Sequence, residues 1–143
     1  MPERGKPSTI TFGSTVSVIH VDKQIAYWRR SAEEDWAVAQ ELLAGGRTRH
    51  GLFFAHLALE KLLKAHVSRH TRDLPPRIHN LVRLAQLAAL QPDSQQLEIL
   101  ADMNAFSIEG RYPETLAPPP TTEEAYIYME RAQKVWEWLQ SLF

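Results

Sequence analysis

Apolar residues along most of the chain recur every three or four positions, which is the period of an α-helix with one buried face. Glycine and proline clusters interrupt this pattern and divide it into five segments. We therefore predict helices at about residues 23–44, 48–70, 79–90 and 94–109, and a last one from the Thr121–Glu124 capping box to Leu139. No segment shows the alternation of a strand. The expected fold is all-α, an antiparallel bundle of about five helices with a four-helix up-and-down core and one short helix.

The segment at about 48–70 differs from the others because its apolar residues cover most of the helix circumference. This pattern is typical of a helix that is surrounded by neighbours, so we predict that it is the central helix. It also favours self-association, since five helices of one copy would not easily cover so much apolar surface.

The helix boundaries follow from local signals. Gly45-Gly46 and Pro75-Pro76 end the first two helices, and Pro92-Asp93-Ser94 separates the third from the fourth. Asp22 is placed to cap the first helix. Residues 1–21 lack a helical period and mix Pro, Gly, Ser and Thr with β-branched residues. We interpret them as a flexible tail with a short extended piece at Val16–Val21, followed by one folded domain at 22–143.

Composition excludes several classes of protein. The chain of 143 residues has no cysteine, which rules out disulfides and thiolate metal sites and fits a reducing cytoplasm. No apolar run is long enough to span a membrane, and the N-terminus lacks the apolar core of a signal peptide. We therefore expect a cytoplasmic protein with no membrane association.

Charge is unevenly distributed along the chain, although the net charge is only −1. The segment from Arg47 to Arg83 holds eight Lys or Arg, two acids and five of the six histidines, so it carries +6 and the remainder −7. A basic, histidine-rich middle suggests an anionic ligand. The alternative is that the charges of two long helices happen to segregate, and composition does not separate these interpretations.

Four strings, in order, resemble the HEPN domain (higher eukaryotes and prokaryotes nucleotide-binding). They are YWRRSAEEDWAVAQELLAGG, GLFFAHLALEKLLKAHV, IHNLVRLAQLA and FSIEGRYPE. Together with the helix pattern they cover about residues 23–140. The resemblance implies a helical bundle that commonly forms homodimers. It also implies a minimal nucleotidyltransferase as partner, in toxin–antitoxin pairs or in nucleotide- or substrate-binding roles.

Catalytic members of this family are metal-independent ribonucleases with an Arg followed, after four to six residues, by His. Arg72 and His79 meet this signature with six residues between them, although Pro75-Pro76 prevent the two from sharing one helical face. Some members carry a Tyr two residues after the His as a target for nucleotide transfer. Leu81 occupies that position here, which puts this form of regulation in doubt.

Metal-free RNA cleavage needs a base, an acid and positive charge at the phosphate. His79 could supply proton transfer, and Arg72 or Arg77 could bind phosphate. Lys64, Asn80 and Arg111 complete the candidate nucleotide- or phosphate-binding set. The simpler interpretation is that His79 or Asn80 only caps the third helix.

Glu60 and Lys64 are spaced i,i+4, with His56 one turn earlier. They are either an intrahelical ion pair or a polar strip facing a cleft, with Arg111 as a candidate partner. His66 and His70 have a zinc-like spacing, but no third ligand accompanies them, so we expect neither a metal nor a cofactor. The leading hypothesis is a HEPN protein that acts with a nucleotidyltransferase on RNA or nucleotides. The alternative is a non-catalytic helical interaction module.

Overall fold

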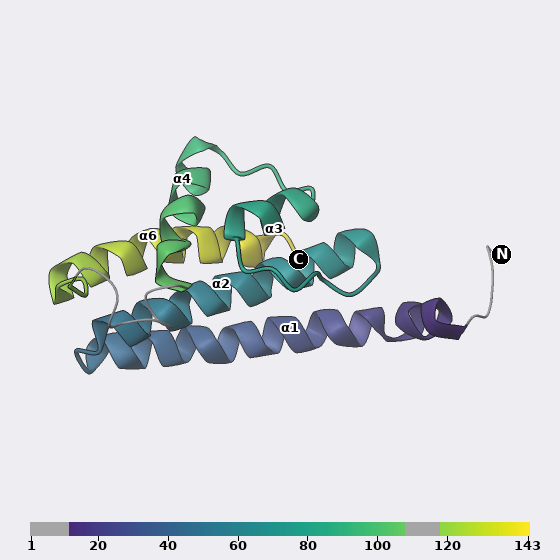
Figure 1. The fold of residues 1–143 in the computed structure, drawn as a ribbon, viewed down its shortest axis with the longest axis horizontal. Coiled ribbons are helices and arrows are strands. Elements are labelled where there is room, and N and C mark those ends of the chain that lie inside the picture. Colours follow the sequence, from purple (N-terminus) through teal and green to yellow (C-terminus); the bar gives the residue numbers. More distant parts are fainter. Residues whose placement is uncertain (1–11, 108–117) are drawn as a thin grey trace.

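The computed structural model describes residues 12–107 and 118–143, with side chains from residue 20 onward. These ranges contain five complete α-helices and no strand, which confirms the all-α bundle. The helices are α1 (Phe12–Ala44), α2 (Thr48–Thr71), α3 (Leu81–Leu87), α4 (Ser94–Met103) and α6 (Thr122–Ser141). In Figure 1, α1 and α2 run side by side along the long axis, and α3, α4 and α6 lie on the other side of α2.

The central position predicted for the second helix is confirmed. α2 contacts α1, α3 and α6, and its large apolar side chains, such as Leu52, Leu59, Leu62 and Leu63, are fully buried. One copy of the chain therefore already covers most of this helix. Our expectation that a second subunit is needed to cover α2 is wrong, and this helix gives no support for self-association.

α2 and α6 run in the same direction. Hydrogen bonds join the start of α2 to the start of α6 and the end of α2 to the end of α6. At the first end, the Thr48 hydroxyl donates a hydrogen bond to the Pro120 carbonyl at 3.0 Å. At the other end, the Arg69 guanidinium donates to the Leu142 carbonyl at 2.6 Å. α1 runs opposite to both helices (Figure 1), and the stacked rings of Trp36 and Trp136, with centroids 4.8 Å apart, join it to α6.

The beginning of the first helix differs from our expectation. α1 starts at Phe12, so Val16–Val21 are helical rather than extended, and Asp22 lies inside the helix instead of capping it. Val21 is buried, with 1% of its surface exposed. β-Branched residues lower helix propensity by only a few tenths of a kcal/mol each, which does not prevent a helix. Whether the segment before residue 22 is a dispensable tail stays a prediction.

Most of the other boundaries agree with the local signals. α4 is an exception, because it ends at Met103 rather than near residue 109, and the side chain of Asn104, its C-cap, accepts from the Leu81 N–H at the start of α3. Asp93 with Gln96 and Thr121 with Glu124 form capping boxes at the starts of α4 and α6. α3 is shorter than predicted because Asn80 caps it and Ala89, with a φ of 57°, follows its end. No helix among the described residues is long and apolar enough to cross a membrane.

Candidate functional site

A strip of polar side chains crosses the buried face of α2. Glu60 and Lys64 are 4% and 7% exposed, and the Lys64 ammonium donates a hydrogen bond to Glu60 Oε2 at 2.9 Å. His56, one turn earlier, is also buried, and its Nδ1 lies 3.8 Å from Glu60 Oε1. Buried ionised groups need partners, and the i,i+4 spacing of a helix places these side chains together.

His79 reaches this strip from the segment between α2 and α3. Its Nδ1 lies 3.0 Å from Glu60 Oε2 and 3.1 Å from Oε1, while its side chain is 47% exposed. An ionised carboxylate only accepts hydrogen bonds, so the proton of a neutral His79 ring belongs on Nδ1. The Nε2 atom then keeps its lone pair. A half-exposed imidazole held in this tautomer can take a proton from a bound molecule.

Asn80, the residue after His79, is held by hydrogen bonds at the start of α3. Its Oδ1 accepts from the Arg83 main-chain N–H at 3.1 Å, which caps α3, and from Asn104 Nδ2 at 3.2 Å. Asn104 in turn accepts from the Leu81 N–H at 2.8 Å. The capping interpretation therefore fits Asn80, whereas His79 points to Glu60. These bonds fix the start of α3, and with it the end of the segment that carries His79.

The arginines of this segment form no bond to Glu60 or His79 among the described residues. Arg72 adopts the left-handed conformation that ends α2, with a φ of 56°, and its guanidinium donates to Asp22 Oδ1 at 2.9 Å. Asp22 belongs to α1, so the partner of Arg72 in this structure is not His79. Arg77 is exposed and forms no ion pair within the described ranges. Arg111 lies outside the described residues.

The surroundings of the cluster combine aromatic and charged groups. The Lys64 ammonium lies 5.6 Å from the centre of the Trp28 ring, a cation–π distance, and Trp28 Nε1 has no hydrogen-bond partner among the described residues.

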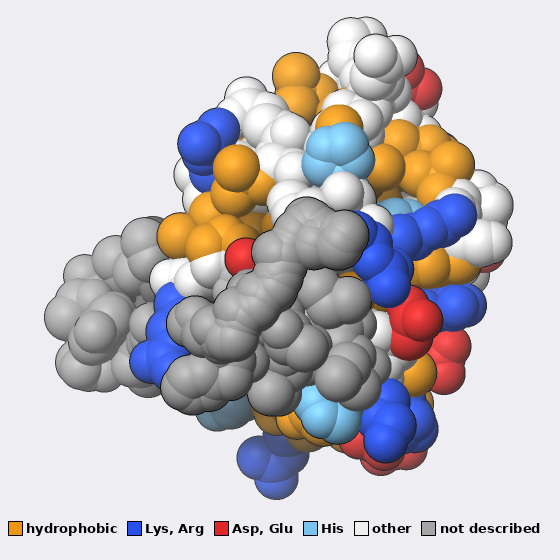
Figure 2. Space-filling model, turned by 90° about the vertical axis from the view of Figure 1, so that its right-hand side faces the viewer, with side chains coloured by type: hydrophobic (Ala, Val, Ile, Leu, Met, Phe, Trp, Pro, Cys, Tyr) orange, Lys and Arg blue, Asp and Glu red, His pale blue; other side chains and the backbone are white. Residues whose placement is uncertain are grey.

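Figure 2 views the right-hand end of the molecule as drawn in Figure 1, where α2 ends. It shows Lys, Arg and His side chains beside Asp and Glu, so the visible part of this face has mixed charge.

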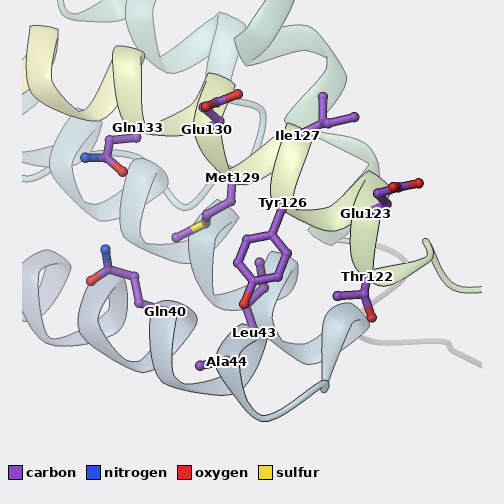
Figure 3. Close-up of a pocket in the computed structure, with 10 residues that line it drawn as sticks. All are labelled: Gln40, Leu43, Ala44, Thr122, Glu123, Tyr126, Ile127, Met129, Glu130 and Gln133. Carbon is purple, nitrogen blue, oxygen red and sulfur yellow. The ribbon is translucent and has the colours of Figure 1, made fainter.

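A separate hollow of about 930 Å³ lies between the end of α1 and the first half of α6 (Figure 3). Its lining includes Leu43, Tyr126, Ile127 and Met129, two glutamates and no Lys, Arg or His from the described residues. This hollow therefore does not coincide with the His79 cluster. Across the described ranges, no three His, Asp or Glu side chains are grouped to hold a metal ion.

Sequence reasoning found the members of the cluster but not their main contact. The Glu60–Lys64 pair follows from i,i+4 spacing, and the structure has it. The bond between Glu60 and His79 joins residues 19 positions apart across a turn, which helical periodicity does not indicate. The family signature, moreover, pairs Arg72 with His79, whereas the structure gives Arg72 to Asp22.

The helical bundle that carries this cluster belongs to a known family of domains. The model of the HEPN domain matches residues 25–142, so the chain belongs to the HEPN family. No curated protein matches the chain.

Two solved structures share the fold. TT1696 from Thermus thermophilus superposes with a TM-score of 0.68 at 25% identity, over 84% of this chain and 98% of that one. The archaeal HEPN homologue ST0689 gives a TM-score of 0.65 at 19% identity, over 82% of this chain and 96% of that one.

Proposed function

We propose that this HEPN protein handles RNA or nucleotides at the His79 cluster, and that it acts there as a metal-independent endoribonuclease. The observation that carries the proposal is the bond between the half-exposed His79 ring and the buried Glu60 carboxylate. A purely structural histidine would more often be buried with both nitrogens satisfied. Here the bonded nitrogen faces the interior and the ring remains accessible.

The chemistry is a transesterification. His79 Nε2 takes the proton of the ribose 2′-hydroxyl, the 2′-oxygen bonds to phosphorus, and the bond from phosphorus to the 5′-oxygen breaks. The leaving 5′-oxygen takes up a proton from solvent. Arg77, exposed and without an acidic partner among the described residues, is the proposed phosphate ligand, and Arg72, Lys64, Asn80 and Arg111 are proposed to border the same site.

The test is cleavage of RNA by the purified chain, with and without EDTA, and growth of cells that express it. His79→Ala should lower the cleavage rate by about 100-fold or more, because a general base is lost. His70→Ala is the matched control, since His70 is an exposed histidine near the same end of α2. If both variants cleave like the parent, His79 is not the base.

The second candidate is a nucleotide- or substrate-binding subunit without cleavage, and the third is a non-catalytic interaction module. The buried Glu60–Lys64 pair favours the second over a plain module, because a buried ion pair is often no more stabilising than apolar residues of the same size. Equilibrium binding of nucleotides to a parent that does not cleave RNA would support it. Neither cleavage nor binding would leave the module.

We further propose a minimal nucleotidyltransferase as partner and a homodimer as the assembled form. Both rest on the family resemblance. Co-expression with a neighbouring gene product of that class, followed by affinity purification, tests the first. Light scattering tests the second, and a mass near the 16.4 kDa of one chain would contradict it.

A further inference from the structure

We infer that His56 is a positioning residue, whose buried N–H fixes the main chain at residue 79 and so holds the His79 ring on Glu60. The inference rests on the proposed function of His79, and it concerns how that site is kept in order.

His56 Nε2 lies 3.1 Å from the main-chain oxygen of His79, and the His56 side chain is 1% exposed. A carbonyl oxygen only accepts, so Nε2 carries the proton and donates it. Breaking this hydrogen bond would leave the buried N–H of His56 without a partner. An unsatisfied buried donor costs free energy, so the contact is hard to lose.

His56 and Glu60 lie one turn apart on α2, which is the most buried helix of the bundle. α2 therefore holds His79 at two points, with His56 on its carbonyl and Glu60 on its ring. Two attachments from one rigid helix fix both the position of the residue and the direction of the ring.

The segment around His79 has few other attachments. Leu74 is 56% exposed, and Pro75-Pro76 have no N–H to donate. Ile78 is partly buried and packs against the core. Within the described residues the ordering of this segment near His79 thus depends on the contacts to α2, on the packing of Ile78 and on the Asn80–Asn104 bonds.

α2 also carries a matched control. His66 is buried as well, and its Nε2 lies 2.9 Å from the Leu139 main-chain oxygen, so it makes the same kind of bond to α6 instead. A change at His66 should therefore disturb the packing of α2 on the end of α6 without altering His79.

The experiment compares His56→Asn, whose amide is too short to reach the carbonyl, with His56→Gln, whose longer amide keeps a donor within reach, and with His66→Asn. Nitrogen-15 NMR of the His79 ring reports its tautomer, and amide hydrogen exchange reports the opening of residues 77–81. In the parent, we expect the Nδ1–H tautomer. In His56→Asn, we expect a mixture of tautomers and exchange about fivefold faster, which corresponds to loss of one hydrogen bond.

Cleavage assays give a further readout. His56→Asn should lower kcat by about tenfold and change KM little, because a misplaced base weakens the chemical step rather than binding. His56→Gln should lie closer to the parent, and His66→Asn should leave the His79 tautomer unchanged.

Two results would overturn the inference: a His79 ring in His56→Asn with the parent tautomer and exchange, or the same changes in His66→Asn. A parent that shows the expected tautomer but cleaves no RNA would instead contradict the proposed function, and the NMR comparison would still decide the role of His56.

Discussion

At the scale of single residues, the Glu60 carboxylate is the centre of the buried polar contacts in α2. Lys64 and His79 both bond to it, and His56 Nδ1 lies 3.8 Å away. Losing this charge leaves the Lys64 ammonium buried without its partner, and an uncompensated buried charge is among the more costly defects in a folded protein.

We therefore predict that Glu60→Gln lowers the free energy of unfolding by about 3 kcal/mol, measured by urea denaturation. Asp22→Asn is the comparison, since it removes the acid of the Arg72 pair, in which the Arg72 and Asp22 side chains are 50% and 82% exposed. That change should cost less than about 0.5 kcal/mol. Equal losses in the two variants would show that the Glu60 cluster is not a buried network.

His66 is a buried histidine whose protonation is linked to folding. Burial lowers its pKa below the ordinary value of 6.5, and the nearby charges of Arg69 and Arg29 act in the same direction, partly offset by the bond to Leu139. His66 therefore stays neutral to a lower pH in the folded protein than in the unfolded chain, which takes up a proton as the pH falls through 6.5.

The stability contributed by neutral His66 is therefore complete above pH 6.5, and it is lost as the pH falls from there to the lowered pKa of the folded state. His66→Gln, which keeps a donor for the Leu139 carbonyl, should make the unfolding free energy less dependent on pH in this window. Urea denaturation at several pH values measures it, and parallel curves for parent and variant would contradict the prediction.

At the scale of the elements, α1 and α2 approach closely at Gly51. A Cβ atom added there would collide with Leu43 Cδ1 and lie 3.2 Å from the Ala39 carbonyl oxygen. We predict that Gly51→Ala lowers the free energy of unfolding by about 1–3 kcal/mol, although alanine favours helix, because the buried Leu43 side chain must shift or the two helices must move apart.

Gly45→Ala is the matched control for this contact. Its added Cβ would lie 3.5 Å from the Glu41 carbonyl oxygen, an ordinary contact distance. The change should therefore stay within about 0.5 kcal/mol. A Gly51→Ala protein as stable as Gly45→Ala would show that the helices are not packed this closely.

Several helix ends were predictable because a local rule controls them. The Gly45-Gly46 stop and the Thr121 capping box act through neighbouring backbone groups, and both are where the sequence predicts them. The start of α1 was not predicted, because no residue in the segment 12–21 prevents helix formation strongly enough to mark a boundary in the sequence. The Glu60–His79 contact was missed because it depends on the conformation of the segment between α2 and α3, which no local sequence rule specifies.

At the scale of the whole molecule, the bundle is held together along α2, which packs directly against α1, α3 and α6. In the first half of α1, burial differs from one residue to the next. Val21, in the first half of α1, is buried, whereas the exposed residues next to it, His20 and Asp22, are not part of the core. The apolar core along α1 therefore reaches at least to Val21.

We predict that deletion of residues 1–20 changes the free energy of unfolding by less than about 1 kcal/mol, because this segment has little periodic apolar surface in the sequence. The deletion keeps Val21, whose side chain is 1% exposed. Val21→Asp in the full chain is the contrasting variant, and burying its unpaired charge should cost about 2 kcal/mol or more. Thermal and urea unfolding measure both proteins. A truncated chain that fails to fold would show that the first part of α1 packs on the bundle or on a second copy of the chain, and the domain would then begin before residue 22.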